Sequence, residues 1–136
     1  MHPCLSRRSL LLAGGAGLGA VALAGCAEGG GVPEVTGAGA GDVVVALADV
    51  PVGSVYEVSL DGRRVLVSRP DAGTVVAFDA RCTHQGCTVR ATDGGLVCPC
   101  HGSAFDPATG AAVHGPATSP LAPVGVAVRG ADVVLR

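Results

Sequence analysis

The 136-residue sequence has no lysine and no tryptophan. It contains only two phenylalanines and one tyrosine. All nine basic residues are arginines, and eleven acidic residues outnumber them, which gives a net charge of −2. Proteins that bind nucleic acid carry basic patches, often interleaved with aromatic side chains that stack on bases. The sequence therefore argues against a nucleic-acid partner, and it predicts a core made of Val, Leu and Ala.

The sequence also lacks an apolar run long enough to span a membrane. The run at residues 10–24 has fifteen residues, whereas a spanning helix needs about 20. It follows the stretch SRRSLL, which contains Arg7 and Arg8 and resembles a twin-arginine export signal. It leads into LAGC, which ends at Cys26 and resembles a bacterial lipobox. We therefore expect residues 1–25 to be a signal peptide and Cys26 to carry a lipid; the alternatives are an uncleaved membrane anchor and a chance cysteine.

Residues 26–41 have no hydrophobic periodicity and consist mostly of Gly, Ala and Val with Pro and Glu. Such a composition is typical of a flexible tether, whose typical reach at this length is about 20 Å. We expect it to hold a folded domain of residues 42–136 close to the membrane. A domain of this size buries only a modest core, so cross-links or bound metal should contribute to its stability.

Helical periodicity is absent after residue 26, and short apolar runs alternate with turn signals. The runs lie at residues 43–47, 55–60, 63–67, 74–78, 96–97, 124–128 and 133–135. Asp61-Gly62 is a strong two-residue hairpin signal between two of them. Many short strands at regular spacing predict an all-β fold, a small antiparallel sandwich or barrel.

Metal-binding side chains are concentrated between positions 82 and 103. This stretch holds four of the six cysteines and two of the four histidines, in the segments CTHQGC at 82–87 and CPCHGS at 98–103. A structural zinc site would use any four of these six groups. The residue types alone therefore predict a metal site on two loops and leave its ligand set open.

The two segments resemble the cluster-binding boxes of high-potential Rieske [2Fe–2S] proteins, the kind found in cytochrome bc complexes. The similarity covers about residues 79–121, because FD at 105–106, TG at 109–110, GPA at 115–117 and PL at 120–121 resemble the family's downstream segment. The resemblance implies a small antiparallel Rieske-type fold with a cluster-binding subdomain of two loops, and one [2Fe–2S] cluster per chain.

By this resemblance, Cys82 and Cys98 are thiolate ligands of one iron, and His84 and His101 are imidazole ligands of the other. Neutral imidazoles make the cluster less negative, so an electron is added more easily. Rieske potentials accordingly span about −150 to +300 mV, against about −400 mV for plant-type ferredoxins. Ser103 resembles the family serine whose hydroxyl donates to a bridging sulfide; a turn-capping serine is the alternative.

The resemblance also implies a disulfide between Cys87 and Cys100, with two free thiols as the alternative. In the chain-entropy model such a bridge stabilises by about 3 kcal/mol. A disulfide persists in an oxidising compartment, and the twin-arginine route exports folded proteins, which suits a cluster inserted in the cytoplasm. Both points favour a location on the outer face of the bacterial cytoplasmic membrane.

Several further positions bear on function. Phe105 stands where high-potential proteins often carry a tyrosine that donates to a ligand sulfur, which argues against a very high potential. Gln85 replaces an apolar residue common in quinol-oxidising Rieske proteins, and we expect it at an exposed tip beside His84. Residues 115–117 resemble the loop that covers the cluster, with a plain Gly-Pro turn as the alternative. We expect His114 to be an ordinary surface residue.

The sequence is thus interpreted as a membrane-tethered carrier of single electrons whose partner is a redox protein or a quinol. A Rieske oxygenase needs a second iron held by two His and a carboxylate. Only His114 remains for it once His2 leaves with the signal and the two cluster histidines are used, so that enzyme class is rejected. Three alternatives stay open: a cytochrome bc-type subunit, the small subunit of an oxidoreductase such as arsenite oxidase, and a structural zinc module.

Overall fold

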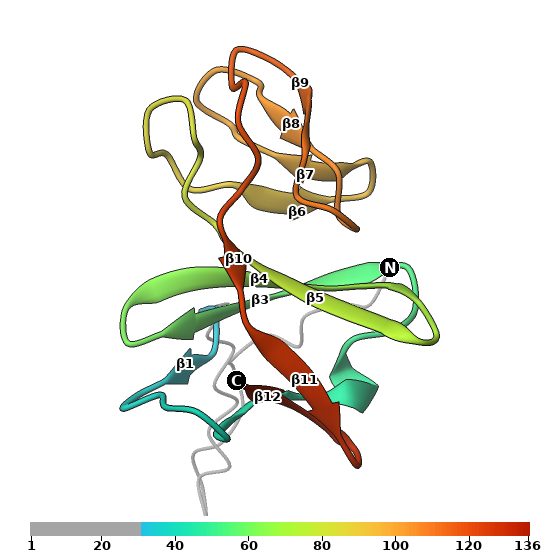
Figure 1. Cartoon of the computed structure of the whole chain (residues 1–136). Coiled ribbons are helices and arrows are strands. Elements are labelled where there is room, and N and C mark those ends of the chain that lie inside the picture. Colours follow the sequence, from blue (N-terminus) through green and yellow to red (C-terminus); the bar gives the residue numbers. More distant parts are fainter. Residues whose placement is uncertain (1–30) are drawn as a thin grey trace, which may run out of the picture.

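The computed structural model describes residues 31–136, so the predicted signal peptide, Cys26 and the first residues of the predicted tether lie outside the described range. Within it, three sheets form three layers (Figure 1). The five-stranded middle sheet has the order β1-β3-β4-β5-β10 and consists of β1 (Glu34–Val35), β3 (Ser54–Leu60), β4 (Arg63–Asp71), β5 (Thr74–Asp79) and β10 (Pro123–Val124).

The other two sheets lie on opposite sides of the middle one. A three-stranded sheet of order β11-β12-β2 contains β2 (Val43–Ala46), β11 (Val126–Arg129) and β12 (Asp132–Leu135). A four-stranded sheet of order β6-β7-β8-β9 contains β6 (Arg90–Thr92), β7 (Gly95–Val97), β8 (Ala104–Phe105) and β9 (Ala112–His114). The one helical segment of the described chain is the short η1 (Leu47–Asp49), so the predicted all-β class is confirmed. No helix in residues 31–136 has the length and apolar character that a membrane span requires.

Strand β4 shows how the middle sheet acquires two buried faces. Its residues Val65, Leu66 and Val67 are fully buried in succession, although successive side chains of a strand point to opposite faces. Val65 and Val67 pack into the core shared with the three-stranded sheet, and Leu66 packs into the core shared with the four-stranded sheet. The continuous apolar run therefore reflects a strand covered on both sides.

The hairpin predicted at Asp61-Gly62 is confirmed. Strands β3 and β4 pair antiparallel, from Ser54↔Arg69 to Leu60↔Arg63. Both turn residues have positive φ, 49° for Asp61 and 78° for Gly62, which is the conformation of a two-residue type I′ turn. The turn that closes β11 and β12 is equally short, since Arg129 pairs with Asp132.

Part of the stretch predicted as a tether is ordered against the middle sheet. Strand β1 lies within it and pairs parallel with β3, with Glu34 opposite Ser59. The Asp61 carboxylate accepts hydrogen bonds from the amides of Gly37 and Ala38, and Glu34 accepts one from Gly62. Residues 34–38 therefore pack against the domain, and β1 with β3 is the one parallel pair among the described strands of an otherwise antiparallel fold.

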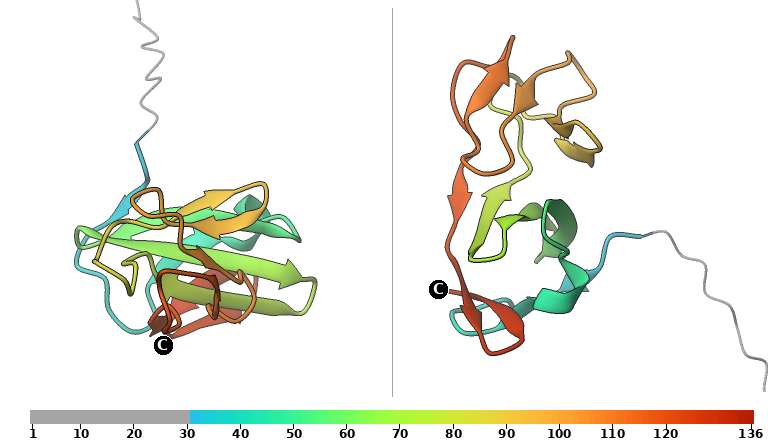
Figure 2. Two further views of the ribbon diagram at one scale, coloured as in Figure 1. Left: turned by 90° about the horizontal axis from the view of Figure 1, so that it is seen from above. Right: turned by 90° about the vertical axis from the view of Figure 1, so that its right-hand side faces the viewer.

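The metal-binding segments lie in a subdomain inserted between β5 and β10. The chain enters it from β5 and returns through β10, and these two strands pair side by side (Figure 2, right). Its core, shared with the middle sheet, contains Phe78, Leu96, Phe105, Cys82 and Cys98. The two loops are thus built on a packed layer of their own.

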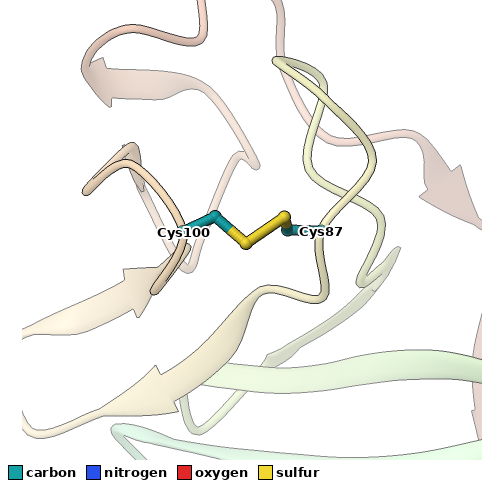
Figure 3. Close-up of a disulfide and its surroundings, with 2 residues drawn as sticks. All are labelled: Cys87 and Cys100. Atoms are coloured by element: carbon teal, nitrogen blue, oxygen red, sulfur yellow. A yellow bond between two sulfur atoms is a disulfide. The ribbon is translucent and has the colours of Figure 1, made fainter.

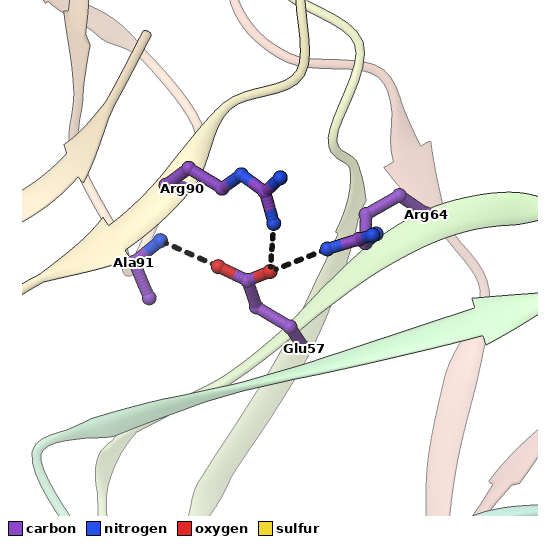
Figure 4. A network of polar contacts seen from close by, with 4 residues as sticks. All are labelled: Glu57, Arg64, Arg90 and Ala91. Atoms are coloured by element: carbon purple, nitrogen blue, oxygen red, sulfur yellow. Dashed lines mark hydrogen bonds and ion pairs between the residues drawn. The ribbon is translucent and has the colours of Figure 1, made fainter. Parts of the chain in front are cut away.

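An ion-pair network joins this subdomain to the middle sheet (Figure 4). Glu57 of β3 accepts hydrogen bonds from Arg64 and Arg90 at 3.1 Å each and from the Ala91 amide at 3.0 Å. Burial alone would raise the pKa of the Glu57 carboxyl. The bonds from Ala91, Arg64 and Arg90 outweigh it, so the pKa lies below its ordinary value.

We expect Glu57→Gln to lower the free energy of unfolding by about 1–2 kcal/mol at pH 7. Glutamine still accepts from Ala91 but no longer carries the charge that faces Arg64 and Arg90. Folding lowers the pKa of this carboxyl, so its charge stabilises the folded protein fully at pH values above the pKa of the carboxyl in the unfolded chain. The stabilisation is lost as the pH falls through the pKa of the carboxyl in the folded protein. The difference between the two proteins should hold from pH 7 to pH 5 and shrink below about pH 4. Thermal unfolding followed by circular dichroism measures it.

Glu34→Gln is the matched control, because Glu34 accepts one amide hydrogen bond and faces no arginine in the described ion pairs. Its effect at pH 7 should be smaller than that of Glu57→Gln. A Glu57→Gln deficit that stayed constant down to pH 3.5 would show that lost packing, and not lost charge, is responsible.

Candidate metal centre

The two metal-binding loops have the same backbone construction. In the first, the Cys82 amide donates to the Cys87 carbonyl and the Gly86 amide to the Cys82 carbonyl. In the second, the Cys98 amide donates to the Ser103 carbonyl and the Gly102 amide to the Cys98 carbonyl. The two glycines have nearly equal positive φ, 79° and 78°, a conformation in which glycine is favoured. Each loop therefore starts on a buried cysteine and turns back on it after four residues.

A disulfide between Cys87 and Cys100 joins the loops (Figure 3). The two Cα atoms are 6.5 Å apart, within the range that a disulfide spans. The predicted bridge is confirmed, and it holds together two loops whose cysteines are separated by 13 positions.

The two cysteines that remain free among the described residues are the first of each loop. Cys82 is 3% exposed and Cys98 is 1% exposed, and both lie in the same buried cluster. The Cys98 sulfur lies within 4.8 Å of both disulfide sulfurs. Cys87 and Cys100 are bonded to each other, so they offer no thiolate, and the thiols available for a metal are Cys82 and Cys98.

The two histidines of the loops face one another. The ring centroids of His84 and His101 are 4.9 Å apart with an angle of 89° between the ring planes. His101 is exposed and His84 is half-buried. The Nδ1 atom of His84 is buried and has no hydrogen-bond partner in the described part of the chain. A buried ring nitrogen without a partner costs free energy unless something else pairs with it, and a metal ion would do so.

Ser103 connects the second loop with a third one. Its side chain is fully buried, and its oxygen accepts a hydrogen bond of 3.0 Å from the Ala117 amide. The Thr83 hydroxyl in the first loop donates to the Ser119 carbonyl at 2.7 Å. The segment of residues 115–119 is thus bonded to both metal-binding loops. The Ser103 hydroxyl proton has no protein acceptor within residues 31–136, so it is free to donate.

The remaining predicted positions lie around this centre. Gln85 is exposed and lines a cleft of about 440 Å³ together with His84 and Cys82. Phe105 is buried in β8 and pairs with Leu96. His114 is exposed on β9, as predicted for a surface residue.

Two structural contributors were missed by the sequence interpretation. Glu57 was not singled out, because a lone acid in an alternating strand gives no sign that its partners lie 33 and 34 residues further along. The hydrogen bonds of residues 117 and 119 to the loops were also missed, because the bonded residues are 14 and 36 positions apart in the sequence. The repeated spacing of a cysteine, then a glycine four residues later, was a signal that could have revealed the common loop construction.

Comparison with known proteins assigns the chain. The model of the Rieske [2Fe-2S] domain matches residues 42–128. The chain is 43% identical over 75 residues to the cytochrome b6-f complex iron-sulfur subunit of Parasynechococcus marenigrum, covering 54% of this chain and 42% of that subunit. It is 42% identical over 108 residues to the carotenoid phi-ring synthase of Chlorobaculum tepidum, covering 75% of this chain and 16% of the synthase. The chain therefore spans less than half the length of these curated relatives.

A solved structure agrees in fold. The plasma membrane Rieske protein PetC3 of Synechocystis PCC 6803 superposes with a TM-score of 0.61 at 31% identity, over 70% of this chain and 98% of that one. The disulfide, the two buried thiols and the facing imidazoles occupy the part of the chain that the domain model covers. The chain belongs to the Rieske [2Fe–2S] domain family, whose cofactor is a [2Fe–2S] cluster.

Proposed function

We propose that this protein is a one-electron carrier in which Cys82 and Cys98 hold one iron of the cluster and His84 and His101 hold the other. The observation that carries the proposal is the pair of buried free thiols beside two facing imidazoles, one with a buried, unpartnered Nδ1. When bound, such a cluster accepts and releases one electron at a potential raised by its histidine ligands. Thiolates and imidazoles are the donor types that this cluster requires.

The chain's own residues give the centre a buried side and an exposed side. Cys82 and Cys98 are nearly inaccessible, whereas His101 is exposed and His84 borders a cleft. Electron transfer needs close approach of a partner, so the histidine side is where an electron enters and leaves. The disulfide and the hydrogen bonds of residues 117 and 119 hold the loops in place, and the two thiols are nearly inaccessible to water.

The proposal is tested on the purified full-length protein by metal and sulfide analysis and by spectroscopy. We expect about two irons and two inorganic sulfides per chain, and after reduction an anisotropic electron paramagnetic resonance signal typical of mixed Cys and His ligation. One zinc per chain without visible absorption would support the structural zinc module instead.

We further propose that the protein is exported by the twin-arginine route and held on the outer face of the cytoplasmic membrane by a lipid on Cys26. The motifs around Arg7, Arg8 and Cys26 support this, as does the disulfide, which needs an oxidising compartment. Changing both arginines to lysine should leave the precursor in the cytoplasm. Cys26→Ser should abolish labelling by radioactive fatty acid, and persistent labelling would refute the lipidation site.

A subunit of a larger oxidoreductase is the second candidate. The similarity to a cytochrome b6-f iron-sulfur subunit supports it, whereas the exposed polar Gln85 beside His84 is unlike the apolar tip expected for quinol oxidation. Native electrophoresis of solubilised membranes separates the candidates: a carrier migrates at the mass of a free small protein, and a subunit migrates with its complex.

Ser103→Ala is expected to lower the reduction potential by some tens of millivolts. The free hydroxyl proton of Ser103 favours the more electron-rich reduced state, and alanine removes it. For one electron, about 59 mV corresponds to a factor of ten in the equilibrium constant. Voltammetry at one pH measures the shift. Ser68→Ala is the control, because Ser68 is also buried but lies on β4 outside the loops; an equal shift in both variants would contradict a specific role for Ser103.

Removal of iron is expected to start exchange between the Cys98 thiol and the neighbouring disulfide. The Cys98 sulfur is within 4.8 Å of both disulfide sulfurs, and ligation to iron would block its attack. In the apoprotein, its thiolate attacks one sulfur of the disulfide, and the other sulfur leaves as a thiolate. The number of free thiols stays constant, but a free thiol appears on Cys87 or Cys100.

Alkylation followed by tryptic digestion and mass spectrometry detects the exchange. Cleavage after Arg81, Arg90 and Arg129 places Cys87 and Cys100 on different peptides, so the native bridge links two peptides. A bond between Cys98 and Cys100 lies within one peptide. Alkylation confined to Cys82 and Cys98 after incubation at pH 8 would contradict the prediction, and the iron-loaded protein serves as the control.

A further inference from the structure

A groove lined by three arginines runs beside the first metal-binding loop. It has a volume of about 360 Å³, and its walls include Arg63, Arg64 and Arg81 together with Asp79 and Gly86. The cleft of about 440 Å³ at His84 shares Asp79, Arg81 and Gly86 with it. The two hollows therefore adjoin, and Arg81 stands at their common wall, between the arginine side chains and the histidine.

Arg81 is placed there by the loop and carries an unpaired charge. A Cβ atom on Gly86 would lie 3.2 Å from the Arg81 Nε and 3.5 Å from its Nη2, so the absence of a side chain at Gly86 leaves room for the guanidinium. The Arg81 backbone amide is fixed by a hydrogen bond to Asp79. Its guanidinium is in none of the ion pairs or side-chain hydrogen bonds of residues 31–136, and the residue is exposed.

Charge is distributed unevenly over the described chain. Around the groove, Arg63, Arg64, Arg81 and Arg90 form ion pairs with only two acids in residues 31–136. Glu57 bonds Arg64 and Arg90, and Asp79 lies 3.8 Å from Arg63. The rest of residues 31–136 carries three arginines against eight acidic side chains. Asp61 lines a neighbouring hollow together with Arg63, but its carboxylate accepts hydrogen bonds from the amides of residues 37 and 38. A positive region therefore adjoins the histidines of a protein that is otherwise negative.

We propose that this groove, with Arg63 and Arg81 as its contact residues, docks the acidic face of a redox partner protein. The inference rests on the proposed electron-transfer function and specifies the partner's charge. A localised positive region beside the half-buried His84 and the exposed His101 orients an acidic partner during encounter, and the negative remainder of the surface disfavours other orientations. The groove and the cleft together extend past Arg81 to His84, so a partner whose carboxylates meet the arginines has its redox group brought to the histidine side.

The test is stopped-flow oxidation of the reduced, iron-loaded protein by two acceptor proteins of opposite charge, an acidic plastocyanin and a basic cytochrome c. Each takes one electron from the reduced cluster. Arg63→Gln with Arg81→Gln should slow oxidation by plastocyanin about tenfold or more at low ionic strength. The parent rate should fall as salt is added, and the salt dependence should flatten in the double variant. Oxidation by cytochrome c should be unchanged or faster.

Arg129→Gln with Arg136→Gln is the matched control, because it also removes two exposed arginines. One lies on β11 and the other directly follows β12, in the three-stranded sheet on the other side of the middle sheet (Figure 1). Its plastocyanin rate should stay within about twofold of the parent. Iron content, visible spectrum and reduction potential of the double variant separate a docking defect from damage next to Cys82. The absence of a reducible cluster from the parent protein would contradict the proposed electron-transfer function itself. A normal cluster with plastocyanin rates that do not depend on the two arginines would contradict only the docking proposal.

A second measurement distinguishes other anionic partners. Hexacyanocobaltate(III), a redox-inert anion, should shift the backbone amide resonances of residues 62–64 and Thr88 in the parent and not in the double variant. If this anion bound in the groove but plastocyanin rates were insensitive to the arginines, the groove would be a small-anion site and the proposal would be wrong. Arginine-dependent binding to vesicles of anionic lipid, with plastocyanin rates unaffected, would point to the membrane surface and would equally overturn it.

Discussion

Cys98→Ser is expected to abolish iron binding, whereas the double change Cys87→Ser with Cys100→Ser is expected to leave about two irons per chain. The Cys98 sulfur is a buried free thiol at the start of the second loop, and Cys87 and Cys100 are consumed by the disulfide. A thiolate is the soft ligand that an iron–sulfur cluster requires, whereas a serine hydroxyl remains protonated and binds such iron poorly. The loss should therefore be complete in one variant and absent in the other.

Iron and sulfide analysis and the visible spectrum of freshly purified proteins measure this difference. The double variant should release its iron faster on heating, because the two loops are no longer joined and the unfolded chain is less constrained. Removing both disulfide cysteines avoids a lone thiol next to Cys98. Two irons per chain in Cys98→Ser, together with no iron in the double variant, would contradict the assignment. Cys87 and Cys100 would then be ligands, and Cys98 would not.

Local features of the fold were predictable because their signals are local. The hairpin at Asp61-Gly62 needs two adjacent residues with positive φ, and that dipeptide supplies them. The same holds for the metal-binding loops, where cysteine, histidine and glycine occur within six residues of one another. The disulfide partner of Cys87 came from the family resemblance, because the residue types alone left the pairing open.

Contacts between distant segments were not predictable. Residues 34–35 show no strand pattern, and they form β1 because β3 presents an edge and Asp61 binds the amides of residues 37 and 38. The same limit applies to Glu57, whose partners Arg90 and Ala91 come together with it only once the inserted subdomain packs on the middle sheet. Three layers likewise could not be inferred from the buried run of β4, since such a run also fits a simpler sandwich.

These distant contacts matter for the centre, because the metal-binding loops rest on the middle sheet. Phe78 of β5 lies in the same buried cluster as Cys82 and Cys98. Its ring packs directly against Gly110, whose amide donates to Asp106 and whose carbonyl accepts from Leu121. The segment between β8 and β9 therefore contacts the Phe78 ring of the middle sheet at Gly110, and the same ring packs in the cluster that contains Cys82 and Cys98.

Gly110→Ala is expected to lower the free energy of unfolding by about 2–4 kcal/mol. An added Cβ would lie 2.7 Å from Cε1 and 2.8 Å from Cδ1 of Phe78, closer than carbon atoms approach without displacement. Phe78 is 4% exposed and packed, so the ring has little room to move away. The φ of Gly110 is also positive, 72°, which costs a residue with a side chain additional free energy. For a domain of this size the melting temperature should fall by about 8–30 °C.

Gly130→Ala isolates the backbone contribution, because Gly130 has a φ of 60° but no atom within 4 Å of the position of an added Cβ. It lies in the exposed turn between β11 and β12, and its cost should be about 1 kcal/mol. The difference between the two variants then measures the clash with Phe78. Because Phe78 shares a buried cluster with both thiols, Gly110→Ala should also speed iron loss on heating, and Gly130→Ala should not. Equal melting temperatures for the two variants would show that the ring moves aside freely, and the proposed coupling between this contact and the centre would then be wrong.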